Sequence, residues 1–250
     1  MSNAITLPEF VEDAETRHPG ILAEYSALKA LVRPLFAHHQ TDEFTHTVML
    51  QAAIVWQHYN AILLLLAHKF GIQGLVLCRT LFEIVVGTLY LMKNPASLTD
   101  FMDHGKLLFY EQCLESGITK HELARIAPEC EAIKARQKGK RRLPWHGKSV
   151  ERLAVAVGLG ETYQQLYRDA STATHADATK TLGHGSRGWR QSLESFRSEK
   201  EADIVNYSAF FLTGHALTLV NQNFDIGCDK EANAVLILMT QRAKAAAMPN

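Results

Sequence analysis

The sequence predicts an all-α protein, a multi-helix bundle with additional helices at its N- and C-terminal ends. Almost every segment carries hydrophobic residues at helical spacing, and none shows the sustained alternation of a β-strand. Hydrophobic residues make up 47% of the chain and prolines number only 7, a composition that excludes disordered and collagen-like proteins. The 250 residues contain no internal repeat or low-complexity linker, which favours a single domain over residues 1–250.

The first four helices are predicted from amphipathic or apolar runs separated by Gly, Pro and polar breaks. They are expected over residues 8–18, 21–38, 43–70 and 72–93. Asp42 is the predicted N-cap of the third helix and Gly71 its end. The fourth helix is apolar around most of its circumference and is stopped by Asn94-Pro95, so we expect it at the centre of the bundle.

The remaining helices are predicted with two long loops between them. The helices are expected over residues 97–116, 119–137, 149–157, 161–175, 200–224 and 230–248. Thr119 and Glu122 have the spacing of a capping box at the start of the second of these. The loops cover residues 138–148 and 177–190, and the bundle core is expected over about residues 43–224.

Composition and cysteine spacing indicate a cytoplasmic protein without a membrane span. The most apolar run, Ala61 to Ala67, is about a third of the roughly 20 residues that a span needs. The N-terminus lacks the basic and apolar regions of a signal peptide. Four cysteines, Cys78, Cys113, Cys130 and Cys228, lie far apart without a Cys-x-x-Cys pair, which argues against a zinc site and a disulfide framework. The formal net charge of +0 argues against a surface that binds polyanions everywhere.

The segment from Tyr167 to Asp177 carries the residues best suited to chemistry. Arg168 and His175 are seven positions apart, so on a helix they share a face with a drift of about 20° and lie roughly 10 Å apart. Ser171 lies between them on that face. A guanidinium that neutralises a phosphate beside an imidazole that moves a proton would suit cleavage of a phosphodiester. The same spacing also occurs by chance on solvated helices.

Arg168, the polar Asp169 and His175 resemble the Arg-x(4–6)-His motif of the HEPN superfamily. The chain also resembles an uncharacterised bacterial helical family, domain of unknown function 5677, over roughly Val48 to Gly185. In that family a helix of the type Cys-Arg-Thr-Leu-Phe-Glu, here residues 78–83, precedes a Tyr-Arg-x-x-Ser-x-x-x-His segment, here residues 167–175.

The HEPN resemblance implies a metal-independent endoribonuclease that works as a homodimer without a cofactor. It implies that His175 is the general acid or base, that Arg168 stabilises charge on the phosphate, and that Asp169 orients one of them at a dimer cleft. It further implies roles in bacterial phage defence or toxin–antitoxin systems, with RNA and a cognate antitoxin or defence protein as partners. Glu43 to His46 is a Glu-x-x-His unit, but a helical di-iron site needs two such units and two further glutamates on facing helices, and no metal is expected.

Further residues are candidates for support of the site or for RNA binding. Arg79 and Glu83, one helical turn apart, are expected either as an ion pair that fixes helix register or as support for the Arg168–His175 stripe, together with Tyr167 and Ser171. Cations beside aromatic rings hold phosphates and stack on bases, and the candidates for this role are Lys138, Lys140, Arg141, Arg142, Trp145, His184 and Arg187. An ordinary solvated loop explains the same composition.

Two other functions remain open from the sequence. The chain is alternatively a non-catalytic helical module that binds RNA, nucleotide or a partner protein, in which Arg168 and His175 only hold an anion or the dimer. In a purely structural bundle, neighbouring side chains would satisfy both residues.

Overall fold

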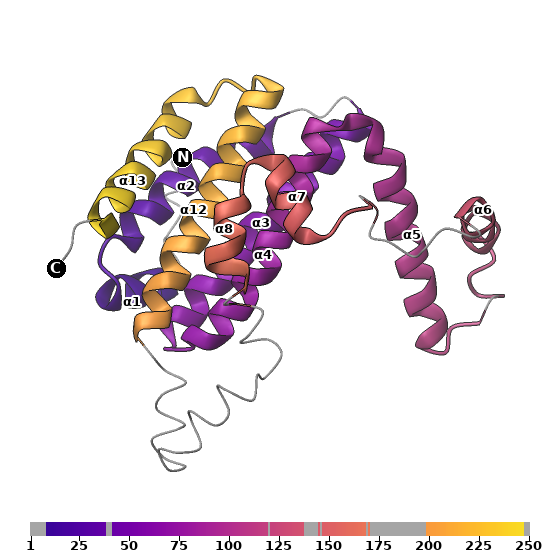
Figure 1. Ribbon diagram of the computed structural model, residues 1–250, viewed down its shortest axis with the longest axis horizontal. Coiled ribbons are helices and arrows are strands. Elements are labelled where there is room, and N and C mark those ends of the chain that lie inside the picture. Colours follow the sequence, from indigo (N-terminus) through magenta and orange to yellow (C-terminus); the bar gives the residue numbers. More distant parts are fainter. Residues whose placement is uncertain are drawn as a thin grey trace, which may run out of the picture.

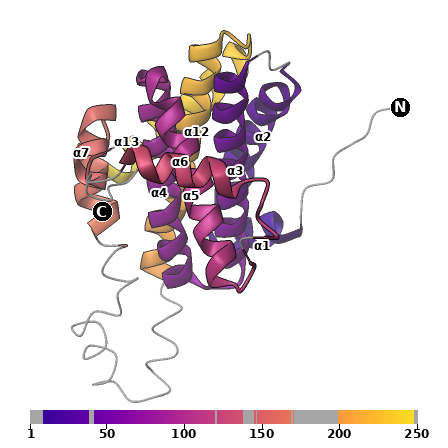
Figure 2. The same cartoon turned by 90° about the vertical axis from the view of Figure 1, so that its right-hand side faces the viewer.

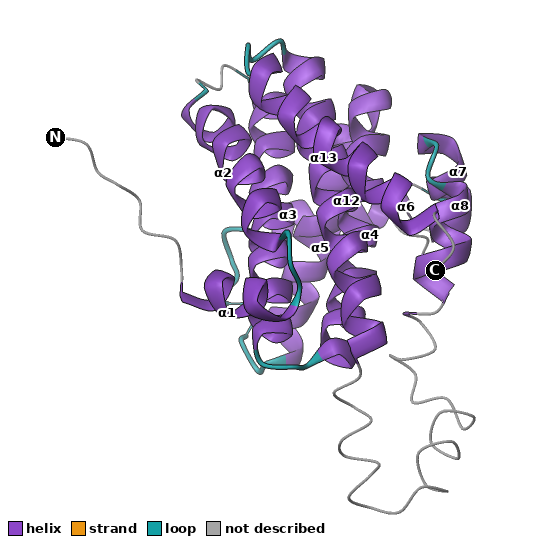
Figure 3. Cartoon of the chain, turned by 90° about the vertical axis from the view of Figure 1, so that its left-hand side faces the viewer, coloured by secondary structure: helices purple, strands orange, loops and turns teal. Residues whose placement is uncertain are grey.

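The computed structural model describes residues 9–38, 42–119, 121–137, 145, 147–168, 170 and 199–247. These residues form helices joined by turns, and no strand occurs among them, so the predicted all-α bundle is confirmed (Figures 1 and 3). The helices are α1 (Glu9–Arg17), α2 (Ile21–Ala37), α3 (Glu43–Ala67), α4 (Gly71–Lys93), η1 (Pro95–Ser97), α5 (Leu98–Glu115), α6 (Ala127–Gln137), α7 (Val150–Val157), α8 (Gly160–Thr162), η2 (Tyr163–Tyr167), α12 (Glu199–Phe224) and α13 (Asp229–Ala247).

Helix α4 lies at the centre of the bundle, as its apolar circumference predicts. It packs along α3 and α12, and α7 and η2 cover a further flank. Its inward residues, among them Phe82, Val85 and Leu89, are buried. Around this centre, α1 packs on α3, and α13 packs on α2 and α12. One edge of α4 departs from the prediction, because Arg79 and Glu83 leave 24% and 41% of their side chains exposed.

The junction between α3 and α4 confirms one predicted helix signal and corrects another. The Asp42 carboxylate accepts a hydrogen bond from the Thr45 backbone N–H at 2.8 Å, which is the expected N-cap. Gly71 was predicted to end α3, but it begins α4 instead. The turn is made by Lys69, whose φ of 63° places a residue other than glycine in the left-handed region.

The predicted helix over residues 119–137 begins later than its capping box suggests. The Thr119 N–H donates to Glu122 Oε2 at 2.8 Å and the Glu122 N–H donates to Thr119 Oγ1 at 3.3 Å, so the box does form. It closes a series of turns, and α6 starts only at Ala127. The Thr119–Glu122 capping box therefore stabilises a turn and does not mark the start of α6.

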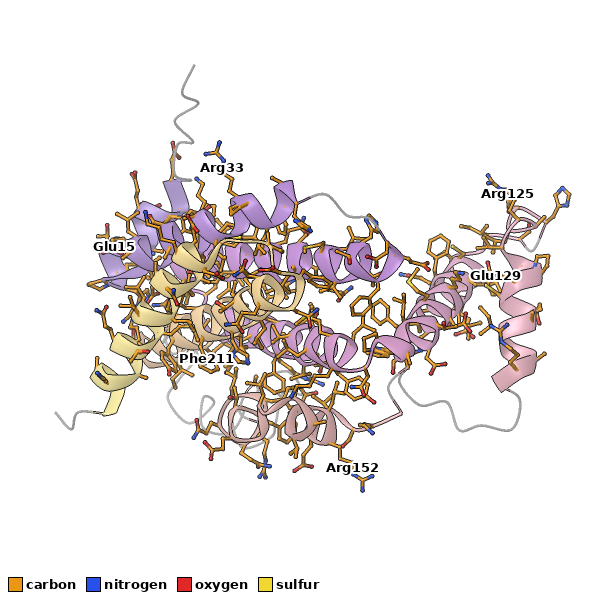
Figure 4. All side chains as sticks on the ribbon, turned by 90° about the horizontal axis from the view of Figure 1, so that it is seen from above. Glu15, Arg33, Arg125, Glu129, Arg152 and Phe211 are labelled. Atoms are coloured by element: carbon orange, nitrogen blue, oxygen red, sulfur yellow. The ribbon has the colours of Figure 1, made fainter. Side chains whose placement is uncertain are left out.

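Helices α5 and α6 form an arm that stands away from the bundle (Figures 1 and 4). The arm has a small core of its own, made of Leu107, Tyr110, Cys113, Leu123, Cys130 and Ile133. Two ion pairs join the helices across this core, Lys106 to Glu129 and Arg136 to Asp103, both with N···O distances of 2.7 Å. The far end of the arm carries Arg125 and Glu129, labelled in Figure 4.

A buried carboxylate ties the C-terminal helix to α2. Glu24 is only 2% exposed, and it accepts a hydrogen bond from Nε of Arg242 on α13. The same guanidinium donates to the Pro19 carbonyl oxygen at 3.3 Å. Gly20, with φ of 102°, lies directly beneath it, and a Cβ added there would come within 3.3 Å of the guanidinium. Glycine is therefore required at this turn both by its backbone and by the guanidinium above it.

Helices α3 and α4 are both long and apolar enough to cross a membrane, judged by length and composition alone. The most apolar windows of α3 and α4 are 39% and 50% buried inside the bundle. Core helices of soluble proteins pass the same test, so two such helices are weak evidence, and the absence of a membrane span stays a prediction.

Candidate functional site

Tyr167 anchors the segment before Arg168 to the central helix. Its side chain is almost fully buried, and its hydroxyl donates a hydrogen bond to Glu83 Oε1 at 2.6 Å. The Arg79 guanidinium lies over the Tyr167 ring, 5.2 Å from the centroid. Arg79 Nε is also 3.3 Å from Glu83 Oε1, which is an ion-pair distance, although its N–H is not aligned for a hydrogen bond. Guanidinium, carboxylate and phenol thus form one contact cluster.

Aromatic packing holds this cluster in place. The rings of Tyr163 and Tyr167 stack with centroids 5.0 Å apart, and Phe82 of α4 contacts both, at 6.3 and 5.5 Å. Such pairs stabilise by about 0.5–1.5 kcal/mol each beyond the area they bury. Burial raises the pKa of Tyr167, and its hydrogen bond to Glu83 raises this pKa further, so the phenol remains a proton donor at neutral pH.

The backbone that carries these tyrosines is a π-helix, where the sequence predicts an ordinary α-helix. The Arg168 N–H bonds the Tyr163 carbonyl oxygen, five residues back. One additional residue in the turn rotates everything after it by about 100° relative to what comes before. Turns of this kind are rare and occur frequently at functional sites.

The turn presents Arg168 on the surface. Its side chain is exposed, and one terminal guanidinium nitrogen donates to Gln164 Oε1 at 3.0 Å. The Gln164 amide in turn donates to Glu151 Oε1 on α7 at 3.1 Å. The Arg168 guanidinium is positively charged and lies at the surface, which suits it to bind an anion.

The structure locates only part of the predicted site. Arg79, Glu83 and Tyr167 form one contact cluster, so the support predicted for Arg79 and Glu83 acts on Tyr167. Arg168 is the next residue in the chain and contacts Gln164. Several predicted site residues lie outside the described residues, namely Asp169, Ser171, His175, Lys138, Lys140, Arg141, Arg142, His184 and Arg187. Within the described part of the chain, no three His, Cys, Asp or Glu side chains are grouped as metal ligands would be.

Trp145, predicted to stack on RNA, is packed between helices. Its ring contacts Phe101 edge-on at 5.0 Å and Tyr90 at 5.8 Å, which joins the start of α5 to the end of α4. Lys148 lies 5.7 Å from the Tyr90 ring on the same patch. This packing accounts for the tryptophan without RNA, and its role in base stacking stays a prediction.

Four residues of the site were not among the predicted ones. Tyr163, Phe82, Gln164 and Glu151 all contact Tyr167 or Arg168, directly or through one neighbour. The i, i+4 spacing of Tyr163 and Tyr167 is a signal for an aromatic pair. Nothing in the spacing of Glu151 indicates its contact, because the π-turn decides which side chains face α7.

The Tyr167 hydroxyl is expected to stabilise the fold modestly. Tyr167→Phe should lower the free energy of unfolding by about 1 kcal/mol, because Glu83 loses its donor but remains partly solvated. Urea unfolding followed by circular dichroism measures the change. Tyr207→Phe is the matched control: the Tyr207 hydroxyl makes no hydrogen bond among the described residues, so its loss should change the free energy by less than about 0.5 kcal/mol. Equal losses in both variants would contradict the anchoring role.

Comparison with known proteins finds one family. The sequence model of a family of unknown function (DUF5677) matches residues 47–188, more than half of the chain, from α3 through the Tyr167–Arg168 turn and beyond it. No curated protein and no solved structure matches the chain.

Proposed function

Since the chain belongs to the family of unknown function DUF5677, we propose a function for it from its own site: a metal-independent endoribonuclease of the HEPN type. The observation that carries the proposal is the placement of Arg168. An exposed guanidinium follows a π-turn, and that turn is fixed to the central helix through Tyr167, Glu83 and Arg79. Rigid support for an anion-binding side chain is what transition-state stabilisation requires.

The proposed reaction is attack of a ribose 2′-oxygen on the adjacent phosphorus. The new O2′–P bond forms as the P–O5′ bond breaks. A general base removes the 2′-hydroxyl proton, and a general acid protonates the leaving 5′-oxygen. The products are a 2′,3′-cyclic phosphate and a 5′-hydroxyl, so no water or cofactor enters this step. His175 serves as the acid or base, and Asp169 orients it or Arg168.

Arg168 would act on the charge that develops on the phosphate. Its guanidinium offers two parallel N–H donors to the non-bridging oxygens. In the proposed homodimer, two copies of the Arg168–His175 segment share one cleft, and the basic residues from Lys138 to Arg142 hold the RNA backbone.

The decisive experiment compares the wild-type chain with His175→Ala on a panel of structured and single-stranded RNAs. We expect cleavage that persists in EDTA, leaves 2′,3′-cyclic phosphate ends, and falls below detection in the variant. Circular dichroism must show the same helical content in both proteins. His121→Ala, which removes an exposed histidine just before α6, is the control and should cleave like the wild type.

Two outcomes would replace the proposal. RNA binding that weakens with salt and yields no product from the wild-type chain would identify a binding module instead of an enzyme. Cleavage that is unchanged in His175→Ala would remove this histidine from the mechanism.

A further inference from the structure

Helix α3 exposes a stripe whose residue types repeat in reverse about its middle. The stripe, called the α3 stripe below, consists of His46, Leu50, Ala53, Gln57, Ala61, Leu64 and His68. Each position and its mirror image about Gln57 carry the same residue: histidine at both ends, then leucine, then alanine. With 100° per residue, all seven lie within about 80° of the helix circumference. The residue types of the stripe are therefore the same whether the stripe is read from its N-terminal or its C-terminal end.

The α3 stripe faces away from the core. Leu50 is 51% exposed and Leu64 is 44% exposed. The opposite side of the same helix carries Val48, Val55 and Ile62, all fully buried. Leu50 and Leu64, with Ala53 and Ala61 between them, make this face apolar over most of its length, and contiguous exposed apolar patches mark interaction surfaces.

We propose that a second copy of this chain binds the α3 stripe, with the two α3 helices antiparallel and a twofold axis at Gln57. A twofold contact requires a patch that is complementary to itself. In this arrangement Leu50 meets Leu64 of the partner subunit, Ala53 meets Ala61 of the partner subunit, and Gln57 meets its own counterpart, whose amide can both donate and accept. Because the residue types of the stripe repeat in reverse about Gln57, two identical α3 helices are complementary to each other.

Charge favours the same occupant. Between Phe44 and His68 the helix contains no Asp, Glu, Lys or Arg, so twofold pairing brings no carboxylate, ammonium or guanidinium of one stripe against its like on the other. Two polar side chains beside the stripe bond to the helix's own carbonyls: Asn60 donates to Trp56 O at 2.7 Å, and His58 Nδ1 lies 2.9 Å from Ile54 O. One polar group of each side chain is thereby paired within its own helix.

The geometry allows close contact and predicts a moderate affinity. Alanines on both sides of Gln57 let the helices approach within the usual interaxial range of about 8–10 Å. The stripe is about 33 Å long and about 10 Å wide, so its footprint is below the ~800 Å² per partner of a standard interface. We therefore expect association that depends on protein concentration.

The α3 stripe is separate from the Arg168 site, so α3 pairing is a second twofold contact, additional to the dimer cleft of the proposed nuclease. The inference does not rest on the proposed function. The turn that carries Arg168 packs on α4 and α8. Figures 2 and 3, seen from opposite sides, both place α4 between α3 and the α7–α8 region. Loss of α3 pairing therefore leaves Arg168 unchanged, and loss of Arg168 leaves the stripe unchanged.

Disulfide trapping tests the twofold directly. Facing Cα atoms on helices with axes about 10 Å apart lie about 5 Å from each other, which a disulfide can span. All four natural cysteines are buried, so the full chain needs no other change. Under mild oxidation, Gln57→Cys should give a covalent dimer in most of the protein. Gln112→Cys, at an exposed glutamine on α5, is the control and should stay monomeric on a non-reducing gel. Equal cross-linking of both variants would overturn the proposal.

Light scattering on size-exclusion chromatography tests the apolar contact. At tens of micromolar, Leu64→Glu should shift the mass from that of the wild type to half of it, while Leu108→Glu on α5, where the leucine is 53% exposed, should not. An unchanged mass in Leu64→Glu would overturn the proposal. Flotation with anionic lipid vesicles is the second measurement. If the wild-type chain floats with the vesicles and Leu64→Glu does not, the stripe binds lipid instead of a second copy.

Discussion

Arg242→Ala is expected to lower the free energy of unfolding at neutral pH by about 3 kcal/mol. Removing one partner of a buried ion pair costs about 3–5 kcal/mol because the other charge stays buried. Glu24 is that charge: it is 2% exposed, and its Oε2 already has no hydrogen-bond partner. We take the lower end of the range because the Arg242 side chain is 34% exposed, and water partly screens the pair.

The size of this loss should depend on pH. Burial raises the pKa of Glu24 above its ordinary value, and the hydrogen bond and charge of Arg242 hold that rise in check. Without Arg242 the folded-state pKa rises further. A carboxyl whose pKa is raised by folding favours the fold in its protonated form, so its contribution is greatest below the ordinary pKa and is lost as the pH rises through the folded value. The variant should therefore lie closer to the wild type at about pH 5 than at about pH 7.

Urea unfolding of the wild type and the variant at both pH values measures this difference. Lys244→Ala removes a positive charge from an exposed site on the same helix, and it should change the free energy by less than about 0.5 kcal/mol. A loss in Arg242→Ala as small as that of the control would show that Glu24 finds another partner or is neutral in the wild type.

Arg168→Ala is expected to reduce the rate of RNA cleavage by about 10²–10³-fold in the proposed nuclease. One preorganised donor to a developing oxyanion contributes an effect of this size. The loss should appear mainly in kcat, because the interaction strengthens as charge builds on the phosphate. Arg168→Lys should recover only part of the rate, since an ammonium keeps the charge but not the two parallel donors.

Arg152→Ala is the matched control for this prediction. Arg152 is an exposed arginine on α7 whose side chain projects outward in Figure 4. It should leave kcat unchanged and alter binding only slightly. Single-turnover kinetics on the best substrate of the panel separate the two effects. Equal losses in both variants would mean that Arg168 contributes only general positive charge.

The sequence was most informative where structure is decided within one or two helical turns. Asp42 caps α3 because its carboxylate needs only the N–H three residues on, and the apolar circumference of residues 72–93 requires burial wherever that helix lies. Thr119 and Glu122 show the limit of such local prediction. Their capping box forms as predicted, yet the chain turns for several residues before α6 begins, because a cap stabilises a helix start but does not by itself nucleate a helix.

The candidate site was likewise predictable in its residue types but not in its long-range contacts. Residue type and spacing singled out Arg79, Glu83, Tyr167 and Arg168, and the structure brings the first three into contact. Spacing on an ideal helix could not show that Tyr167, rather than Arg168, contacts the pair on α4. The π-turn changes the register, and within it Tyr163 and Tyr167 both pack against Phe82 of α4, which is 81 residues from Tyr163 in the sequence.

By itself, the sequence determined that the chain is helical, which runs are apolar, and which residues can carry charge or a proton. Tertiary structure alone decided which residues far apart in the sequence meet. Glu24 and Arg242 are 218 positions apart, and Tyr167 and Glu83 are 84 apart. Helical periodicity is a local property of the backbone, whereas such pairs form only once helices have packed, and the free energy of packing is summed over contacts that no single segment contains.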